Sequence, residues 1–253
     1  MLDKRQIQEL TKVSGFSLWQ TEKDYLQHVF LLFLSIESKR ELIFKGGTAL
    51  QKVYGLNRFS LDLDFTSTNG KEEEIVNKIA KDIKDFGYET EVSKNVQYKE
   101  ESKSLTLKIK GPLYDGTEKS ITSLRIEISH RRDLQLEPET KEIVPIYPDI
   151  RPYIVLVMRL EEILAEKIRA IYKRGRARDL YDLWFLIRKN TKYDTKLINK
   201  KLEYYKLTYN KQELKKKIQE IEKIWVQELK PIATFTPQFQ TILKDIEPLL
   251  NNQ

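Results

Sequence analysis

A pair of glycines between a predicted strand and a predicted helix most limits the fold of this chain. Residues 41–45 form a short apolar run, Gly46-Gly47-Thr48 follows at once, and residues 49–54 are predicted to form a short helix. Glycine lets the backbone turn tightly and lets a ligand approach closely. The first turn of a helix offers unpaired N–H groups and the positive end of the helix dipole, which suits a phosphate. We therefore expect Gly46, Gly47 and Thr48 to bind phosphate, with the Thr48 hydroxyl as a further donor.

Two aspartates follow on the next predicted strand. Residues 61–65 alternate apolar and acidic side chains, so Asp62 and Asp64 share one face of that strand. Two carboxylates about 5–7 Å apart form an oxygen-rich site of the kind that Mg²⁺ prefers. Phosphate donors beside such a site are typical of phosphoryl or nucleotidyl transfer. Each motif alone is a common turn or a common solvent-facing strand pattern, whereas the two in this order are more specific.

Composition and missing motifs exclude several other classes. The chain has no Walker A loop and no Gly-x-Gly-x-x-Gly motif, which disfavours P-loop and Rossmann sites. The 253 residues include no cysteine, which excludes thiol catalysis and cysteine-ligated metals, and two histidines make a histidine-rich zinc site improbable. No apolar run approaches about 18 residues and the first residues are charged, so we expect no membrane span, no signal peptide and a cytoplasmic location.

The sequence around the glycines and aspartates resembles a known family. Residues 45–50 are Lys-Gly-Gly-Thr-Ala-Leu and residues 54–65 are Tyr-Gly-Leu-Asn-Arg-Phe-Ser-Leu-Asp-Leu-Asp-Phe. This pattern is similar to the nucleotidyltransferase core of the AbiEii/AbiGii toxin family, whose members resemble minimal nucleotidyltransferases of the polymerase-β type. The family carries Gly-Ser or Gly-Thr at a helix start, then Ser-x-Asp-x-Asp on a strand. The match adds Ser60 to the candidate nucleotide-binding residues.

Ser60 supports one further hypothesis. It lies two residues before Asp62, where a phosphate would add about −2 charge beside a site that must admit a triphosphate. We predict that phosphorylation of Ser60 silences the protein, and an unchanged rate for a phospho-Ser60 preparation would contradict this. In the alternative, Ser60 is a turn residue that bonds its own backbone.

A third carboxylate is expected on another strand. Residues 124–129 alternate strictly, so Glu127 faces away from Ile126 and Ile128, which we expect in the core. Nucleotidyltransferases of this broad type hold a third carboxylate that completes the metal site or takes the proton from the attacking hydroxyl, and Glu127 is the candidate for both roles. An exposed glutamate paired with a lysine, or neutralised by Arg125, carries equal weight.

A second signature lies more than 100 residues further along, with six basic residues from Lys167 to Arg178. Lys167 lies beside the apolar stripe of a predicted helix, where its ammonium could hold a triphosphate as a point charge. The pattern Glu-Lys-x-x-Ala-x-x-x-Arg-x-x-x-Arg-Asp-Leu-Tyr-Asp-Leu resembles the second signature of the same family. By that match Lys167 and Asp179 are candidate catalytic residues, and Asp182 is a weaker one. In the alternative, Asp179 caps its helix and pairs with a neighbouring arginine.

Charge divides the chain into two parts. Residues 1–159 carry 25 basic and 25 acidic residues, whereas residues 160–230 carry 19 and 11. A basic second part is typical of a polyanion-binding protein, although a solvated lysine-rich surface is the simpler alternative.

Periodicity and the resemblance together predict an α+β fold. A nucleotidyltransferase-type mixed β-sheet with flanking helices covers residues 1–158, and an all-helical basic domain over residues 159–253 completes the active-site cleft. The expected helices are 4–12, 22–38 (capped by Thr21), 49–54, 71–86, 160–172, 178–188, 196–207, 211–229 and 237–249. The expected strands are 41–45, 61–65, 88–96, 105–109, 120–129 and 154–158, with a proline-rich connection over 138–152.

The favoured function is a Mg²⁺-dependent nucleotidyltransferase, with Mn²⁺ as the alternative metal, that moves a nucleoside monophosphate from an NTP to a hydroxyl. The resemblance implies a toxin of a toxin–antitoxin or abortive-infection system, a cognate antitoxin as partner, and tRNA as the favoured acceptor. Two alternatives stay open: transfer to a protein or small-molecule hydroxyl, and a nucleotide- or RNA-binding module without catalysis. Salt-dependent polynucleotide binding and an Asp62→Ala variant discriminate them.

Overall fold

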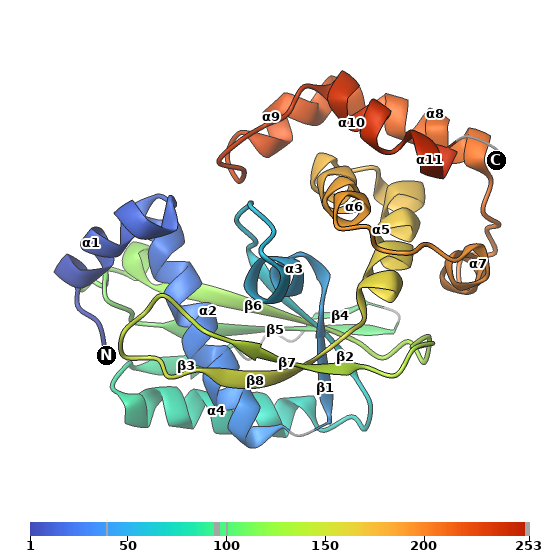
Figure 1. Ribbon diagram of the computed structural model, residues 1–253. Helices are drawn as coiled ribbons and strands as arrows, with labels where there is room; N and C mark the ends of the chain where they lie inside the picture. Colours follow the sequence, from blue (N-terminus) through green and yellow to red (C-terminus); the bar gives the residue numbers. More distant parts are fainter. Residues whose placement is uncertain (39, 94–96, 100, 251–253) are drawn as a thin grey trace. The chain divides into compact units, whose positions relative to one another are not determined.

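The chain folds into two compact units in the computed structural model, which describes residues 1–38, 40–93, 97–99 and 101–250 (Figure 1). The first unit comprises Met1–Gly55, Phe59–Arg132 and Pro138–Val157. The second comprises Leu56–Arg58, Asp133–Glu137 and Met158–Gln253. Two short segments that precede Met158 in the sequence therefore belong to the same unit as the C-terminal helices.

A mixed β-sheet of eight strands, counted over the described residues, forms the centre of the first unit, in the order β3-β5-β6-β2-β1-β8-β7 with β4 paired to β5. Pairing is antiparallel except for β1 with β8 and β2 with β6, which are parallel. The strands are β1 Leu42–Lys45, β2 Asp62–Ser67, β3 Thr90–Val92, β4 Gln97–Lys99, β5 Ser102–Ile109, β6 Thr122–Ser129, β7 Glu139–Ile143 and β8 Tyr153–Val157.

Helices α2 and α4 lie against the apolar face of this sheet (Figure 1). Phe30 of α2 packs against Phe65 of β2, with ring centroids 6.3 Å apart. The alternation along β2 buries Leu63 and Phe65 and turns the two aspartates to the opposite face, as predicted. The helices of this unit are α1 Lys4–Ser14, α2 Leu18–Glu37, α3 Gly46–Tyr54, α4 Glu72–Phe86 and the 3₁₀ turn η1 Glu118–Ser120.

The named elements of the second unit, over the described residues, are all helices, as predicted, and an isolated β-bridge joins Arg58 to Ala233. The α5 residues Leu164, Ile168 and Ile171 are fully buried, and the buried Trp225 donates from its indole nitrogen to the Pro237 carbonyl at 2.8 Å. Its helices are α5 Leu160–Arg174, α6 Ala177–Arg188, α7 Thr195–Glu203, α8 Lys211–Ile221, η2 Glu222–Ile224, α9 Trp225–Leu229, α10 Phe239–Asp245 and α11 Glu247–Leu250. None of the described helices combines the length and the apolar character that crossing a bilayer requires.

Several expectations about element bounds were wrong, among them the single helix expected over 237–249, which is observed as α10 and α11. The connection expected over 138–152 contains β7, and the helix expected over 211–229 is interrupted by η2. Helix α2 begins four residues earlier than predicted, because Ser17 and Gln20 form a capping box, whereas Thr21 lies inside the first turn. The strand expected over 88–96 is observed as Thr90–Val92, and residues 94–96 lie outside the described residues.

Candidate functional site

The glycine pair brings the start of α3 against an aspartate of β2. Gly46 is the first residue of α3 and has a left-handed φ of +74°. A Cβ atom at Gly46 would lie 2.3 Å from Oδ2 of Asp64, so a side chain at this position would displace the carboxylate. The first N–H groups of a helix have no partner within the helix. The turn therefore places a helix N-terminus directly beside a carboxylate, in the arrangement that a metal-bound phosphate needs.

Three carboxylates lie on one face of the sheet. In the parallel pair of β2 with β6, Asp62 is opposite Arg125 and Asp64 is opposite Glu127. The neighbouring Ile126 is fully buried, which confirms that Glu127 faces away from the core. Glu127 Oε1 forms an ion pair with the Arg125 guanidinium at 2.5 Å, so the structure contains the alternative in which Arg125 neutralises Glu127.

Asp62 and Asp64 are the residues that fit a metal ion in this structure. Among the described residues, no group of three or more histidines, aspartates or glutamates is placed to hold a metal ion. Mg²⁺ binds through one or two carboxylates together with substrate phosphates, so the donor set of Asp62 and Asp64 beside the start of α3 fits such an ion. Glu127 as a third metal ligand stays a prediction.

Thr48 and Ser60 bond to each other inside the protein. Thr48 is fully buried, and its hydroxyl donates to Ser60 Oγ at 2.7 Å and also contacts the Asp62 carbonyl. The hydroxyl that we expected to reach a phosphate is therefore turned inward, where it ties α3 to β2. Ser60 is 8% exposed, so a kinase would reach it only after this segment opens. Its predicted phosphorylation stays a prediction.

The second signature forms a buried charge cluster between α5 and α6. Lys167 Nζ lies 2.7 Å from Asp182 Oδ2 and 3.4 Å from Asp179 Oδ1. Arg174 bonds Asp179 at 2.7 and 2.8 Å, and Arg58 bonds Asp182 with two contacts of 2.6 Å. Both carboxylates are fully buried, and Lys167 is 7% exposed. The lysine is thus enclosed by aspartates, with Asp182, the weaker candidate, as its nearer partner.

The cations keep both aspartates ionised. Burial alone would raise the pKa of Asp179, but Lys167 and Arg174 lower that pKa to about 2. Burial is likewise outweighed at Asp182, where Arg58 and Lys167 hold the pKa below its ordinary value. The three cations contacting the pair exceed its two negative charges by one. Arg58 was missed as a functional residue, although it lies inside the first motif.

The predicted site residues fall into two sets. The first unit contains the phosphate and carboxylate set: Gly46, Gly47, Thr48, Ser60, Asp62, Asp64 and Glu127. The second unit contains the cluster of Lys167, Asp179 and Asp182, joined by Arg58.

Both sets of residues lie within the stretch that one family model matches. The family model described as nucleotidyl transferase AbiEii toxin of a type IV toxin–antitoxin system matches residues 33–252. The chain belongs to the AbiEii family. It is therefore a nucleotidyltransferase of a toxin family, as the two motifs predicted. None of the curated proteins compared with the sequence matches it.

Solved structures share the fold of this AbiEii protein. MenT4, a nucleotidyltransferase toxin from Mycobacterium tuberculosis, is 18% identical, with a TM-score of 0.66 over 100% of this chain and 91% of its own. JHP933 from Helicobacter pylori is also 18% identical, with a TM-score of 0.56 over 93% of this chain and 91% of its own. These likenesses extend over nearly the whole chain, so both units belong to the shared fold.

Proposed function

We propose that this AbiEii-family nucleotidyltransferase uses Mg²⁺, or Mn²⁺ in its place, to transfer a nucleoside monophosphate from an NTP to the 3′ end of a tRNA. The observation that carries the proposal is the close approach of Gly46 to Asp64, where an added Cβ would meet the carboxylate, because it puts a helix start that suits phosphate beside a carboxylate that suits a metal ion.

In the first unit, one set of residues binds the phosphates and another binds the metal ion. The backbone N–H groups of Gly46 and Gly47 bind triphosphate oxygens, while Asp62 and Asp64 hold the ion. When bound, the ion neutralises the triphosphate and activates the acceptor hydroxyl. The acceptor oxygen forms a bond to the α-phosphorus, the bond from that phosphorus to the bridging oxygen breaks, and pyrophosphate leaves. Glu127 is the candidate acceptor of the hydroxyl proton.

The helical unit supplies positive charge for the triphosphate. Lys167 lies in a cluster where Arg58 and Arg174 also contact the two aspartates. An ammonium among fixed neighbours suits a phosphate oxygen. In this proposal, Lys167 binds the triphosphate, and Asp179 and Asp182 fix the direction of its ammonium.

A basic hollow beside α7 is the proposed contact for the RNA backbone. Lys196, Lys200 and Lys206 line it together with Asn199 and with Glu203, which lies 3.3 Å from the Lys200 ammonium. Tyr205 precedes Lys206 in the sequence, and its ring centroid lies 4.3 Å from the ammonium of Lys173. Aromatic rings among cations can stack bases. A small-molecule acceptor would not need this surface, which favours a polynucleotide.

A labelling experiment tests the proposal. The purified protein is incubated with total tRNA, Mg²⁺ and each α-³²P-labelled NTP in turn, beside Asp62→Ala and beside Asp85→Ala, an exposed aspartate of α4 that serves as the matched control. We expect label on the RNA with wild type and Asp85→Ala only. Label on protein instead would contradict the acceptor but keep the chemistry. Equal cell toxicity of wild type and Asp62→Ala without any transfer would favour the non-catalytic binding module.

A further inference from the structure

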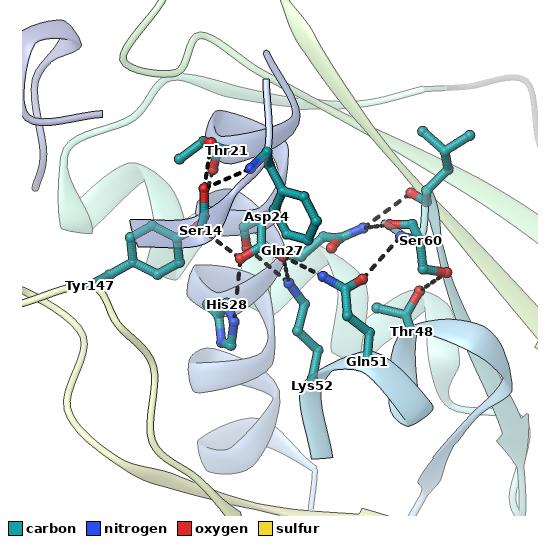
Figure 2. Close-up of polar contacts among 12 residues, drawn as sticks. Ser14, Thr21, Asp24, Gln27, His28, Thr48, Gln51, Lys52, Ser60 and Tyr147 are labelled. Carbon is teal, nitrogen blue, oxygen red and sulfur yellow. Dashed lines mark hydrogen bonds and ion pairs between the residues drawn. The ribbon is translucent and has the colours of Figure 1, made fainter. Parts of the chain in front are cut away.

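The segment that enters β2 is held by a buried polar network (Figure 2). From α2, Gln27 Nε2 donates to the Ser60 carbonyl at 2.9 Å and to the Leu61 carbonyl at 3.1 Å. From α3, Gln51 Oε1 accepts from the Ser60 N–H at 3.0 Å. The Thr48 hydroxyl bonds Ser60 Oγ at 2.7 Å. The N–H, the carbonyl and the hydroxyl of Ser60 are thus all bonded, two residues before Asp62.

Asp24 anchors this network from within α2. Its Oδ1 accepts from Gln51 Nε2 at 2.8 Å and also contacts the ammonium of Lys52, while its Oδ2 accepts from the Tyr147 hydroxyl at 2.7 Å. Burial alone would raise the pKa of Asp24, but Lys52 and His28 hold it below its ordinary value. Asp24 therefore stays charged, and through Gln51 it fixes the acceptor that the Ser60 N–H meets (Figure 2).

Gln27 is a polar side chain at a buried position where packing alone would favour an apolar one. The residue is fully buried in α2, and among the described residues its Oε1 has no hydrogen-bond partner. An unpaired buried acceptor is costly, and an apolar side chain of the same volume would avoid that cost. What glutamine adds is the pair of bonds to two successive carbonyls. This exception to packing is of the kind that proteins keep at functional sites.

We propose that Gln27 and Gln51 are positioning residues for the carboxylate pair, with Asp24 as their anchor: they fix the Ser60–Leu61 backbone and thereby aim Asp62 and Asp64. The inference rests on the proposed function. A metal and a triphosphate must meet both carboxylates in one geometry, and a displacement of about 1 Å in such a site costs about 100-fold in rate.

Gln27→Met tests the inference, because it keeps the volume and removes both donors. Its matched control is Gln20→Met, the same change two turns earlier on α2, at a residue whose side-chain oxygen accepts from the N–H and the hydroxyl of Ser17. Three quantities are compared: kcat with KM for the NTP, Mn²⁺ affinity by electron paramagnetic resonance, and amide hydrogen exchange of residues 58–65. Gln51→Met provides a second variant in case Gln27→Met fails to fold.

For Gln27→Met and Gln51→Met we expect kcat to fall about 10–100-fold with KM within about threefold. We also expect Mn²⁺ affinity to weaken about tenfold, and exchange of residues 58–65 to accelerate about tenfold, with Gln20→Met unchanged in each. Accelerated exchange with wild-type kcat and Mn²⁺ affinity would overturn the positioning role, as would unchanged exchange. A wild-type protein without transfer activity would contradict the proposed function instead, and exchange and Mn²⁺ affinity would still decide the positioning.

Discussion

Two buried polar networks, one in each unit, differ in the charged groups that they contain. In the first unit, Asp24 contacts the ammonium of Lys52, and Gln51 and Gln27 bond neutral backbone groups of Ser60 and Leu61. In the second unit, Asp179 and Asp182 face three cations. We expect the network of the first unit to fix a geometry and the cation-rich cluster of the second unit also to attract an anion. The two halves of the proposed chemistry, aiming carboxylates and holding phosphate, follow this division.

The cluster in the second unit should be the more sensitive to loss of one charge. Asp182→Asn removes the carboxylate that Arg58 and Lys167 share, and breaking a buried pair from one side costs about 3–5 kcal/mol. Urea unfolding measures the loss. The control is Asp245→Asn in the same unit, which weakens one bond to Trp184 and should cost about 0.5–1.5 kcal/mol. Equal losses for the two variants would contradict the sensitivity that we assign to the buried charge cluster.

The two units should also differ in their response to acid. Burial lowers the pKa of His28 to about 3, whereas an unfolded histidine titrates near about 6.5. Between these values the unfolded chain binds one more proton than the folded chain, so stability is lost as the pH falls. The loss from this residue is about 3 kcal/mol between pH 6.5 and 4. Both histidines of the chain lie in the first unit, whereas Asp179 of the second unit, whose pKa is lowered to about 2, loses its contribution to stability only below about pH 4.

Hydrogen exchange at a series of pH values measures each unit separately. We expect protection in α2 to decline from pH 6.5 downward while protection in α6 stays constant to about pH 4. His28→Gln should flatten the decline in α2. A parallel decline in both units, or a decline that survives His28→Gln, would contradict the assignment.

The two ends of α3 offer a paired test of the first unit. Gly46 and Gly55 both have left-handed φ values, +74° and +80°, but only a Cβ at Gly46 meets Asp64, since nothing lies within 4 Å of a Cβ at Gly55. Gly46→Ala and Gly55→Ala should each cost about 1–2 kcal/mol from backbone strain. Only Gly46→Ala should reduce nucleotidyl transfer, by about 100-fold. Equal transfer rates for the two variants would separate Asp64 from the chemistry.

The smallest effect is expected on the basic surface of α7. Lys200→Ala removes one cation from the hollow lined by Lys196 and Lys206. RNA affinity should fall uniformly across sequences, and the slope of log affinity against log salt should drop by about 0.7 to 0.9. Lys141→Ala, on β7 of the first unit, is the control. An unchanged slope for Lys200→Ala would assign the lysine to a solvated surface.

Sequence alone predicted the features that depend on short periods. The alternation along β2 and β6 placed Asp62, Asp64 and Glu127 on the solvent side of the sheet, because a strand repeats every two residues. Strand β7 was missed, since its residues Glu139–Ile143 are polar and lie between prolines, as suits an edge strand that resists further pairing. The sequence contains the capping box of α2 at Ser17 and Gln20, but the helix start was predicted from the apolar stripe and was therefore placed too late.

The supporting residues of the site could not be predicted in the same way. Gln27 and Gln51 lie on helices where a glutamine is ordinary, and their role depends on where β2 passes in three dimensions. Arg58 belongs to the first motif but pairs with Asp182, 124 positions further along the chain. The sequence indicates which groups perform the chemistry, and packing decides which groups hold them in place.

The most direct test of the account follows the fate of each phosphate. One reaction with tRNA and Mg²⁺ contains α-³²P-labelled NTP, and a parallel reaction contains γ-³²P-labelled NTP, each with wild type and Asp62→Ala. The account predicts that wild type places only the α label on the RNA and releases the γ label as pyrophosphate, and that Asp62→Ala does neither. Transfer of the γ label to the RNA would contradict nucleotidyl transfer by this site, and so would an active Asp62→Ala protein.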